Sequence, residues 1–260
     1  MPKSRADWNK DQKVALRFFA GLALKYNIKA GGVNHKVNST MLQNPNDSGP
    51  IFVGINVTNL PSNSCSIASV AANSGSDLSK WPGSIRCQQG SGSLVQDLEM
   101  MMKERMSAFV GKKARPSKII VYRGGVTEDQ YQRVLDDEFP KIKRARDTVY
   151  SGEGGPKITM LIVSKGHQNR FHPVGNHIVG VDRRVNGESN DSKNAASGPM
   201  VNSSRPTPGT IIERKHDLDG AWDFFLQSHY APDGIAGPSS AKPAHYIVIK
   251  EEEKVCRFFT

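Results

Sequence analysis

Two lysines four residues apart, Lys25 and Lys29, are the first candidates for chemistry in this sequence. They lie at the end of an apolar pattern over 11–26 that predicts an amphipathic helix, directly before a Gly-Gly pair that breaks it. Side chains at this spacing project from one face of a helix. Two ammonium groups there could neutralise a phosphate as point charges. Two ordinary surface lysines would show the same spacing.

Cysteine chemistry is not supported by the spacing of the thiols. Cys65, Cys87 and Cys256 are far apart, and no two of them form a CxxC pair. Three cysteines without that spacing fit neither a zinc ribbon nor a disulfide framework. A reducing compartment is therefore the better interpretation, and we expect a cytoplasmic protein.

The excess positive charge is concentrated in two segments of the 260-residue chain, whose formal net charge is +10. Residues 1–36 hold eight Lys or Arg against two Asp, and residues 103–146 hold twelve against six acidic residues. Clustered Lys and Arg indicate a polyanion partner, although a solvated basic surface would have the same composition. The longest apolar stretches span about eight residues, whereas a membrane span needs ~20, so we expect no membrane partner.

The apolar pattern also predicts the elements that position these groups. Strands are expected over 51–57, 66–72, 83–89, 118–122, 157–164 and 244–249. Helices are expected over 11–26, 94–109, 131–142 and 219–228. Pro140 should kink or break the third of these helices, and the polar, Gly- and Pro-rich residues 186–210 are predicted to form a mobile loop.

This order of elements predicts an α/β fold. Three strands are followed by helix, strand, helix and strand, which favours a mixed sheet covered on its faces by helices. An RNase H-like fold has this order, and other mixed-sheet folds would also be compatible with the pattern alone.

Five segments, taken in order, resemble the Argonaute family. LKYNIKAGGVN (24–34) is similar to the family's LKINVKLGGVN. The segment 119–145 contains YRGGV and resembles the Piwi-domain sequence YRDGVSEGQF and the helix that follows it. The segment 158–173 is similar to VVQKRHHTRFFP, 208–230 to PGTVVD…FDFYLCSH, and 242–249 to RPTHYHVL. The resemblance implies an RNase H-like mixed sheet flanked by helices.

The resemblance also suggests how the chain is divided. It begins at the last helix of the family's Mid domain, so residues 1–36 are expected to be a remnant of the end of Mid. Residues 37–260 are expected to be an incomplete Piwi domain, truncated at the C-terminus, because the family continues for two more helices. The N-terminal and PAZ domains have no counterpart in the 260 residues.

The family's catalytic positions carry unexpected residues. Slicing Argonautes resemble RNase H in using two Mg²⁺ ions, which need hard anionic oxygen ligands. The resemblance places three of the carboxylate positions at Asn56, Ser93 and Gly124, and assigns the fourth ligand to the absent C-terminal segment. An amide oxygen is a weak neutral ligand, a hydroxyl is poorer, and glycine has no side chain. We therefore expect no catalytic residue, no metal ligand and no productively bound Mg²⁺.

RNA-contacting positions are better preserved. In the family, lysines at the positions of Lys25 and Lys29 help to hold the 5′-phosphate of the guide, and a loop further along meets the guide backbone. The RNA-binding residues that the resemblance implies are Lys25, Lys29, Lys165, His167 and Arg170. Gly166 and Gln168 replace loop residues that are usually basic or histidine, which weakens the loop surface.

The leading hypothesis is therefore an Argonaute-like Piwi protein that binds small guide RNA in RNA-mediated gene silencing without cutting. Target RNA and silencing-complex proteins are further candidate partners. One alternative is a metal-dependent, RNase H-like endoribonuclease with relocated carboxylates. Asp97, Glu128 and Asp129 are the nearby candidates, although helix positions explain them as solvated or capping groups. Another alternative is a gene fragment without independent function.

Overall fold

The described residues of this computed structural model form two compact units. Residues 5–35, 49–60, 65–75, 78–90, 92–110, 116–151, 154–169, 171, 206, 208–214, 222–228 and 242–253 are described. One unit comprises Met1–Met160 with Lys250–Thr260, and the other comprises Leu161–Ile249.

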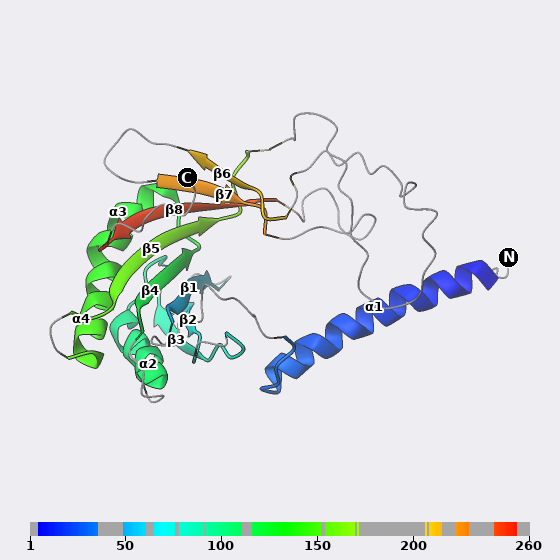
Figure 1. The fold of residues 1–260 in the computed structure, drawn as a ribbon, viewed down its shortest axis with the longest axis horizontal. Helices are drawn as coiled ribbons and strands as arrows, with labels where there is room; N and C mark the ends of the chain where they lie inside the picture. The colour runs from blue at the N-terminus through cyan, green and yellow to red at the C-terminus, as the bar shows by residue number, and fades with distance from the viewer. Residues whose placement is uncertain are drawn as a thin grey trace, which may run out of the picture. The chain divides into compact units, whose positions relative to one another are not determined.

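The first unit is built on the strands β1 (Ile51–Asn59), β2 (Cys65–Ala72), β3 (Gly83–Gln89) and β4 (Lys118–Gly124). β1 pairs antiparallel with β2, and β2 pairs antiparallel with β3 (Figure 1). β4 pairs in parallel with β1. Alternate residues of β2 and β4 are buried, as expected for strands with one face against a core. The strands predicted over 51–57, 66–72, 83–89 and 118–122 are therefore confirmed.

The helix α2 (Leu98–Val110) covers one face of these strands. It contacts β2 and β3 and packs against α4 (Phe139–Val149). Its buried side chains are Leu98, Met101, Met102, Met106 and Phe109. They follow the predicted apolar stripe, and only Leu94 lies before the helix. Unbranched methionines fill irregular space in a core well.

The helical region that contains Pro140 changes geometry directly before the proline. A 3₁₀ turn (Glu128–Gln130) and one α-helical turn (Tyr131–Arg133) lead into a π-helical segment (Val134–Glu138), which continues as α4. The amide of Phe139 donates to the carbonyl of Val134, five residues back. A proline lacks the donor that a regular helix needs, and a π-bulge rearranges the bonds around it. The predicted break is confirmed.

The strands β5 (Lys157–Ser164), β6 (Ile211–Arg214), β7 (Trp222–Leu226) and β8 (Ala244–Glu251) complete one sheet. The hydrogen-bonded order is β3-β2-β1-β4-β5-β8-β7-β6. β7 pairs antiparallel with β6 and with β8. The predicted strands over 157–164 and 244–249 are confirmed, and the mixed sheet has the predicted α/β architecture.

The helix predicted over 219–228 is wrong, because residues 222–226 form β7. Burial alternates along this strand, with Asp223 and Phe225 buried and their neighbours half-buried. Aromatic residues fit such a half-buried pleated surface, and a segment of five residues is too short for an independent helix. β6 was not predicted. Most of the predicted loop over 186–210 lies outside the described residues.

The N-terminal helix α1 spans Arg5–Lys29 and is longer than the predicted 11–26. Its apolar face is not buried against the described residues. Leu16 and Phe18 are 68% and 67% exposed, and Phe19 and Leu22 are also exposed. No helix in the described part of the chain is long and apolar enough to cross a membrane.

Candidate nucleic-acid interface

The positions of Asn56 and Gly124 meet at one edge of the sheet. β1 and β4 run in parallel with Ile55 opposite Arg123, so the next residue of each strand lies at the same carboxyl edge. A Cβ atom added at Gly124 would lie 3.6 Å from Oδ1 of Asn56, which is ordinary van der Waals contact. The structure therefore brings together Asn56 and Gly124, which the resemblance assigns to two of the family's carboxylate positions.

Arg123, the residue directly before Gly124, contacts the backbone of Ser93. The guanidinium of Arg123 donates to the backbone carbonyls of Ser93 and Gly124. Arg123 is itself buried against the carboxylate of Glu138, from the π-helical segment. Sequence reasoning missed this network. The spacing carried a signal for it. Arg123 stands at a position of β4 where the alternation expects a buried residue, and Glu138 lies four residues after buried Val134 on the same helical face.

Asn56, Ser93 and Gly124 offer no charged side chain. Exposed Asn56 uses its amide nitrogen to contact Oγ1 of Thr58 at 3.5 Å, and half-buried Ser93 contributes a hydroxyl. One amide, one hydroxyl and a glycine do not fit two Mg²⁺ ions, which prefer carboxylate oxygens. Within the part of the chain that the structure describes, no three His, Cys, Asp or Glu side chains form a group that could hold a metal ion.

The nearby carboxylates lie on the surface. Asp97 is exposed, and its backbone carbonyl accepts the Met101 amide at the start of α2. Glu128 and Asp129 are exposed in the 3₁₀ turn. Burial raises the pKa of the neighbouring Tyr131, and the charge of Glu128 raises it further. These placements agree with the interpretation of the three carboxylates as solvated or capping groups.

Lys25 and Lys29 lie on the last two turns of α1, as predicted, and both side chains are exposed. The helix ends in a Schellman motif. The Gly31 amide donates to the Ile28 carbonyl at 3.0 Å, and the Gly32 amide donates to the Asn27 carbonyl at 2.8 Å. Gly31 has a φ of 84°, which favours glycine. The GGVN sequence therefore ends the helix directly after the two lysines.

Much of the positive charge in the segment 103–146 is already paired. The pairs are Lys103 with Glu99, Arg105 with Glu104, Lys118 with Glu253, Arg123 with Glu138, Lys141 with Asp137, Arg144 with Glu99, and Arg146 with Asp147 and Glu252. Only part of the predicted basic surface is therefore available to a polyanion. Arg133 and Lys143 are two exposed cations that remain in the helical region.

In the second unit, the predicted RNA-binding side chains of the loop after β5 differ in their exposure to solvent. Lys165 is exposed. His167 is half-buried, with Nε2 2.6 Å from the carbonyl of Pro243 and its ring edge-on to Phe225 at 5.0 Å between centroids. Arg170 lies outside the described residues. His167 therefore has structural contacts that account for its orientation, whereas Lys165 faces solvent.

A second histidine completes this cluster. His245 of β8 stacks on Phe225 with centroids 4.1 Å apart, and its Nε2 lies 2.5 Å from Oδ2 of buried Asp223. His167 and His245 have centroids 6.2 Å apart. Buried polar groups need such partners, so the cluster is part of the packing of β7 and β8.

The Piwi domain family profile matches residues 5–257 of this sequence. The chain belongs to the Piwi domain family. It is 31% identical over 244 residues to protein argonaute 18 of Oryza sativa subsp. japonica, covering 91% of this chain and 20% of that protein. It is 30% identical over 253 residues to protein argonaute 7 of Arabidopsis thaliana, covering 93% of this chain and 22% of that protein. The chain thus spans about a fifth of the length of these curated relatives.

Solved Argonaute structures share the fold of this Piwi chain. Kluyveromyces polysporus Argonaute, solved with a guide RNA, aligns with a TM-score of 0.70 at 23% identity, covering 95% of this chain and 27% of that one. The C-terminal lobe of a budding yeast Argonaute aligns with a TM-score of 0.72 at 21% identity, covering 95% and 48%. The predicted RNase H-like mixed sheet flanked by helices is confirmed. The domain boundary after residue 36 stays a prediction.

Proposed function

We propose that this chain binds a small guide RNA in RNA-mediated gene silencing and does not cut RNA. The observation that supports the binding role is the Piwi family match over 5–257, together with the exposure of Lys25 and Lys29, the two α1 positions at which the resemblance implies guide contacts. A related Argonaute was solved with a guide RNA. Target RNA and silencing-complex proteins are further proposed partners, and the proposed compartment is the cytoplasm.

The proposed lack of cleavage is supported by the donor set at the β1–β4 edge. Asn56 and Gly124 lie together there, and the backbone of Ser93 is bonded to the adjacent Arg123. Two divalent cations would need several negative charges at this point. The three positions offer no anionic oxygen, so we expect Mg²⁺ not to bind productively.

The test combines binding with cleavage. Purified protein is loaded with a 5′-phosphorylated guide and mixed with a fully matched target in Mg²⁺ or Mn²⁺. We expect the guide to be retained and the labelled target to stay intact. Target cleavage that depends on the guide and disappears on chelation would instead support relocated carboxylates. Failure to retain any guide would contradict the binding role.

A further inference from the structure

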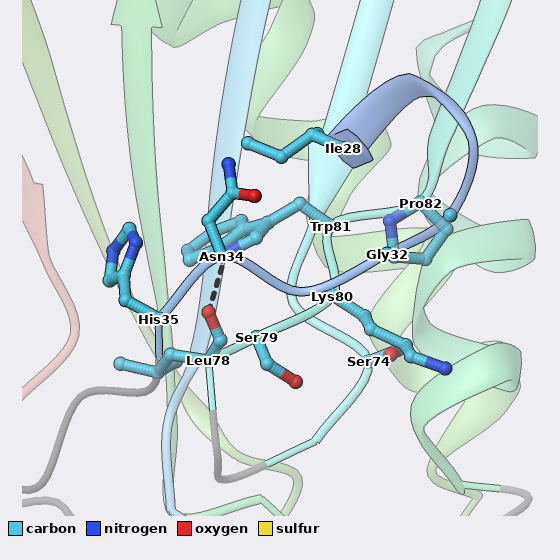
Figure 2. A pocket seen from close by; sticks show the side chains of 11 residues that line it. Ile28, Gly32, Asn34, His35, Ser74, Leu78, Ser79, Lys80, Trp81 and Pro82 are labelled. Carbon is cyan, nitrogen blue, oxygen red and sulfur yellow. Dashed lines mark hydrogen bonds between the residues drawn. The ribbon is translucent and has the colours of Figure 1, made fainter. Parts of the chain in front are cut away.

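A cavity of about 530 Å³ lies between two segments of the first unit (Figure 2). One wall is the end of α1 and the loop up to His35, and the other is the turn that leads from β2 to β3. Its volume lies within the ~300–1,000 Å³ typical of ligand pockets. The cavity does not include the Asn56–Gly124 edge or the two lysines of α1.

The α1 wall is held in place by side-chain bonds as well as by the Schellman motif. Nδ2 of Asn27 donates to Oδ1 of Asn34 at 2.7 Å, and Nδ2 of Asn34 donates to the Leu24 carbonyl at 2.9 Å. A Cβ atom at Gly32 would lie 2.1 Å from the Asn27 side chain. The loop therefore folds back on the helix in one defined way, and Asn34 and His35 are presented to the cavity.

The opposite wall is also organised by the protein itself. The Ser74 amide donates to the Lys80 carbonyl at 3.0 Å, and the Ala72 amide donates to the Pro82 carbonyl at 3.2 Å. The indole N–H of Trp81 donates to the Leu78 carbonyl at 2.8 Å. This bond fixes the Trp81 ring before any ligand binds, so the ring is a preformed wall of the cavity.

Trp81 presents an exposed aromatic surface at this site. It is 48% exposed, and Figure 2 shows its ring directed toward Asn34 and His35 of the opposite wall. Lys80 and His35 line the same cavity, and none of the described residues that line it is acidic. An aromatic face beside cationic and hydrogen-bonding groups is the combination that binds single-stranded nucleic acid.

We propose that this cavity binds one nucleotide of a single-stranded RNA, with the base stacked on Trp81 and the phosphate near Lys80 and His35. The proposal rests on the RNA binding proposed above. It adds a second RNA contact, separate from the one at Lys25 and Lys29. An aromatic ring stacks on any base, because every base has a π-face. The amides and hydroxyls of Asn34, Ser74 and Ser79 supply donors and acceptors around the rim.

The first experiment uses Trp81 as its own reporter. The chain has three tryptophans, so the variant W8F/W222F leaves Trp81 as the only tryptophan that can be excited selectively. This protein is titrated with a short mixed-sequence single-stranded RNA, and RNA binding is followed independently by anisotropy of a labelled copy. We expect saturable quenching of Trp81 that parallels the anisotropy curve.

Two substitutions at Trp81 separate stacking from folding. W81A should weaken RNA binding roughly 5- to 150-fold, whereas W81F keeps an aromatic face and should retain most of the affinity. Circular dichroism checks that both variants fold. If W81A does not fold, K80A in the W8F/W222F protein carries the test. K80A should lower quenching at a fixed RNA concentration, and K157A, an exposed lysine of β5 that does not line the cavity, should not.

The outcomes distinguish a failure of the cavity site from a failure of the proposed guide-RNA binding. RNA binding that leaves Trp81 unquenched and is unchanged in W81A overturns the cavity site, while guide binding stands. An absence of RNA binding in all proteins overturns both. Quenching by an acidic peptide but not by RNA would assign the cavity to a protein partner and also overturn the proposal.

Discussion

Arg123 and Glu138 form a fully buried ion pair, with Nε of the guanidinium 2.8 Å from Oε2 of the carboxylate. A second bond joins Nη2 to Oε1 at 3.0 Å, and Oε1 also accepts the Val95 amide at 2.9 Å. The remaining guanidinium donors contact the carbonyls of Ser93 and Gly124. One charge pair thus connects the end of β4, the segment before α2 and the π-helical turn.

Removing the carboxylate should destabilise the protein strongly. In E138Q the guanidinium of Arg123 stays buried without its counter-charge, and breaking a buried pair in this way costs about 3–5 kcal/mol. Urea unfolding measures the loss in the free energy of unfolding. E99Q is the matched control, because Glu99 pairs with Lys103 and Arg144 at the surface. Equal losses in the two variants would contradict a special role of the buried pair.

Glu104 should make stability depend on acid pH. The Ser84 hydroxyl donates to its carboxylate and Arg86 pairs with it, so the pKa of Glu104 is held below its usual range. A carboxyl with a lowered folded pKa binds its proton more readily when unfolded. Its stabilising contribution is therefore complete above the unfolded pKa, about 4.3, and is lost as the pH falls through the lower folded value.

The measurement is the urea midpoint between about pH 6 and pH 3. Wild type should lose stability more steeply at the acid end than E104Q. S84A removes the hydroxyl donor without touching the carboxyl, and should give an intermediate slope. Parallel curves for wild type and E104Q would show that the Glu104 contacts do not matter for folding.

Two adjacent glycines should differ sharply in their tolerance of a side chain. Gly125 has a φ of 75°, and a Cβ there would lie 2.8 Å from Oδ1 of Asn56. G125A should therefore cost about 1–2 kcal/mol from the left-handed backbone alone, with the contact adding to it. G124A is the control, since its Cβ meets Asn56 at 3.6 Å. Thermal melts that lower both midpoints equally would refute this difference.

The sequence pattern predicted the elements whose burial is regular. The short continuous apolar run over 51–57 and the strand-like segments 66–72 and 118–122 identified β1, β2 and β4, because each of these strands has a core face. The run WDFFL (222–226) does not predict its own strand, since consecutive aromatic residues have no clear period of two or of 3.6. Only its pairing with β6 and β8 makes it a strand.

The candidate site was predictable in residue identity and not in geometry. The resemblance named Asn56 and Gly124, but their proximity follows from a parallel pairing between distant strands, which no local pattern contains. The Arg123–Glu138 pair depends in the same way on the π-helical register before Pro140. The Trp81 cavity requires two segments that are distant in sequence to meet.

Lys25 and Lys29 should contribute to RNA affinity through a single phosphate. Both ammonium groups are exposed and four residues apart on α1, so both can approach one phosphate. Each phosphate charge neutralised on a single strand contributes about −0.7 to the slope of log K against log salt. A terminal 5′-phosphate carries about two negative charges, so K25A/K29A should flatten that slope by roughly 1.4 and should reduce the preference for 5′-phosphorylated over 5′-hydroxyl RNA.

The matched control is K143A/K157A, which removes two exposed lysines of α4 and β5 and keeps the same net charge as K25A/K29A. If the salt slope reflected only net charge, the two double variants would flatten it equally. A specific phosphate site instead requires that only K25A/K29A lose the 5′-phosphate preference. If wild type shows no such preference, or K25A/K29A retains it together with the full slope, then the two lysines are ordinary surface residues and RNA affinity arises elsewhere on the chain.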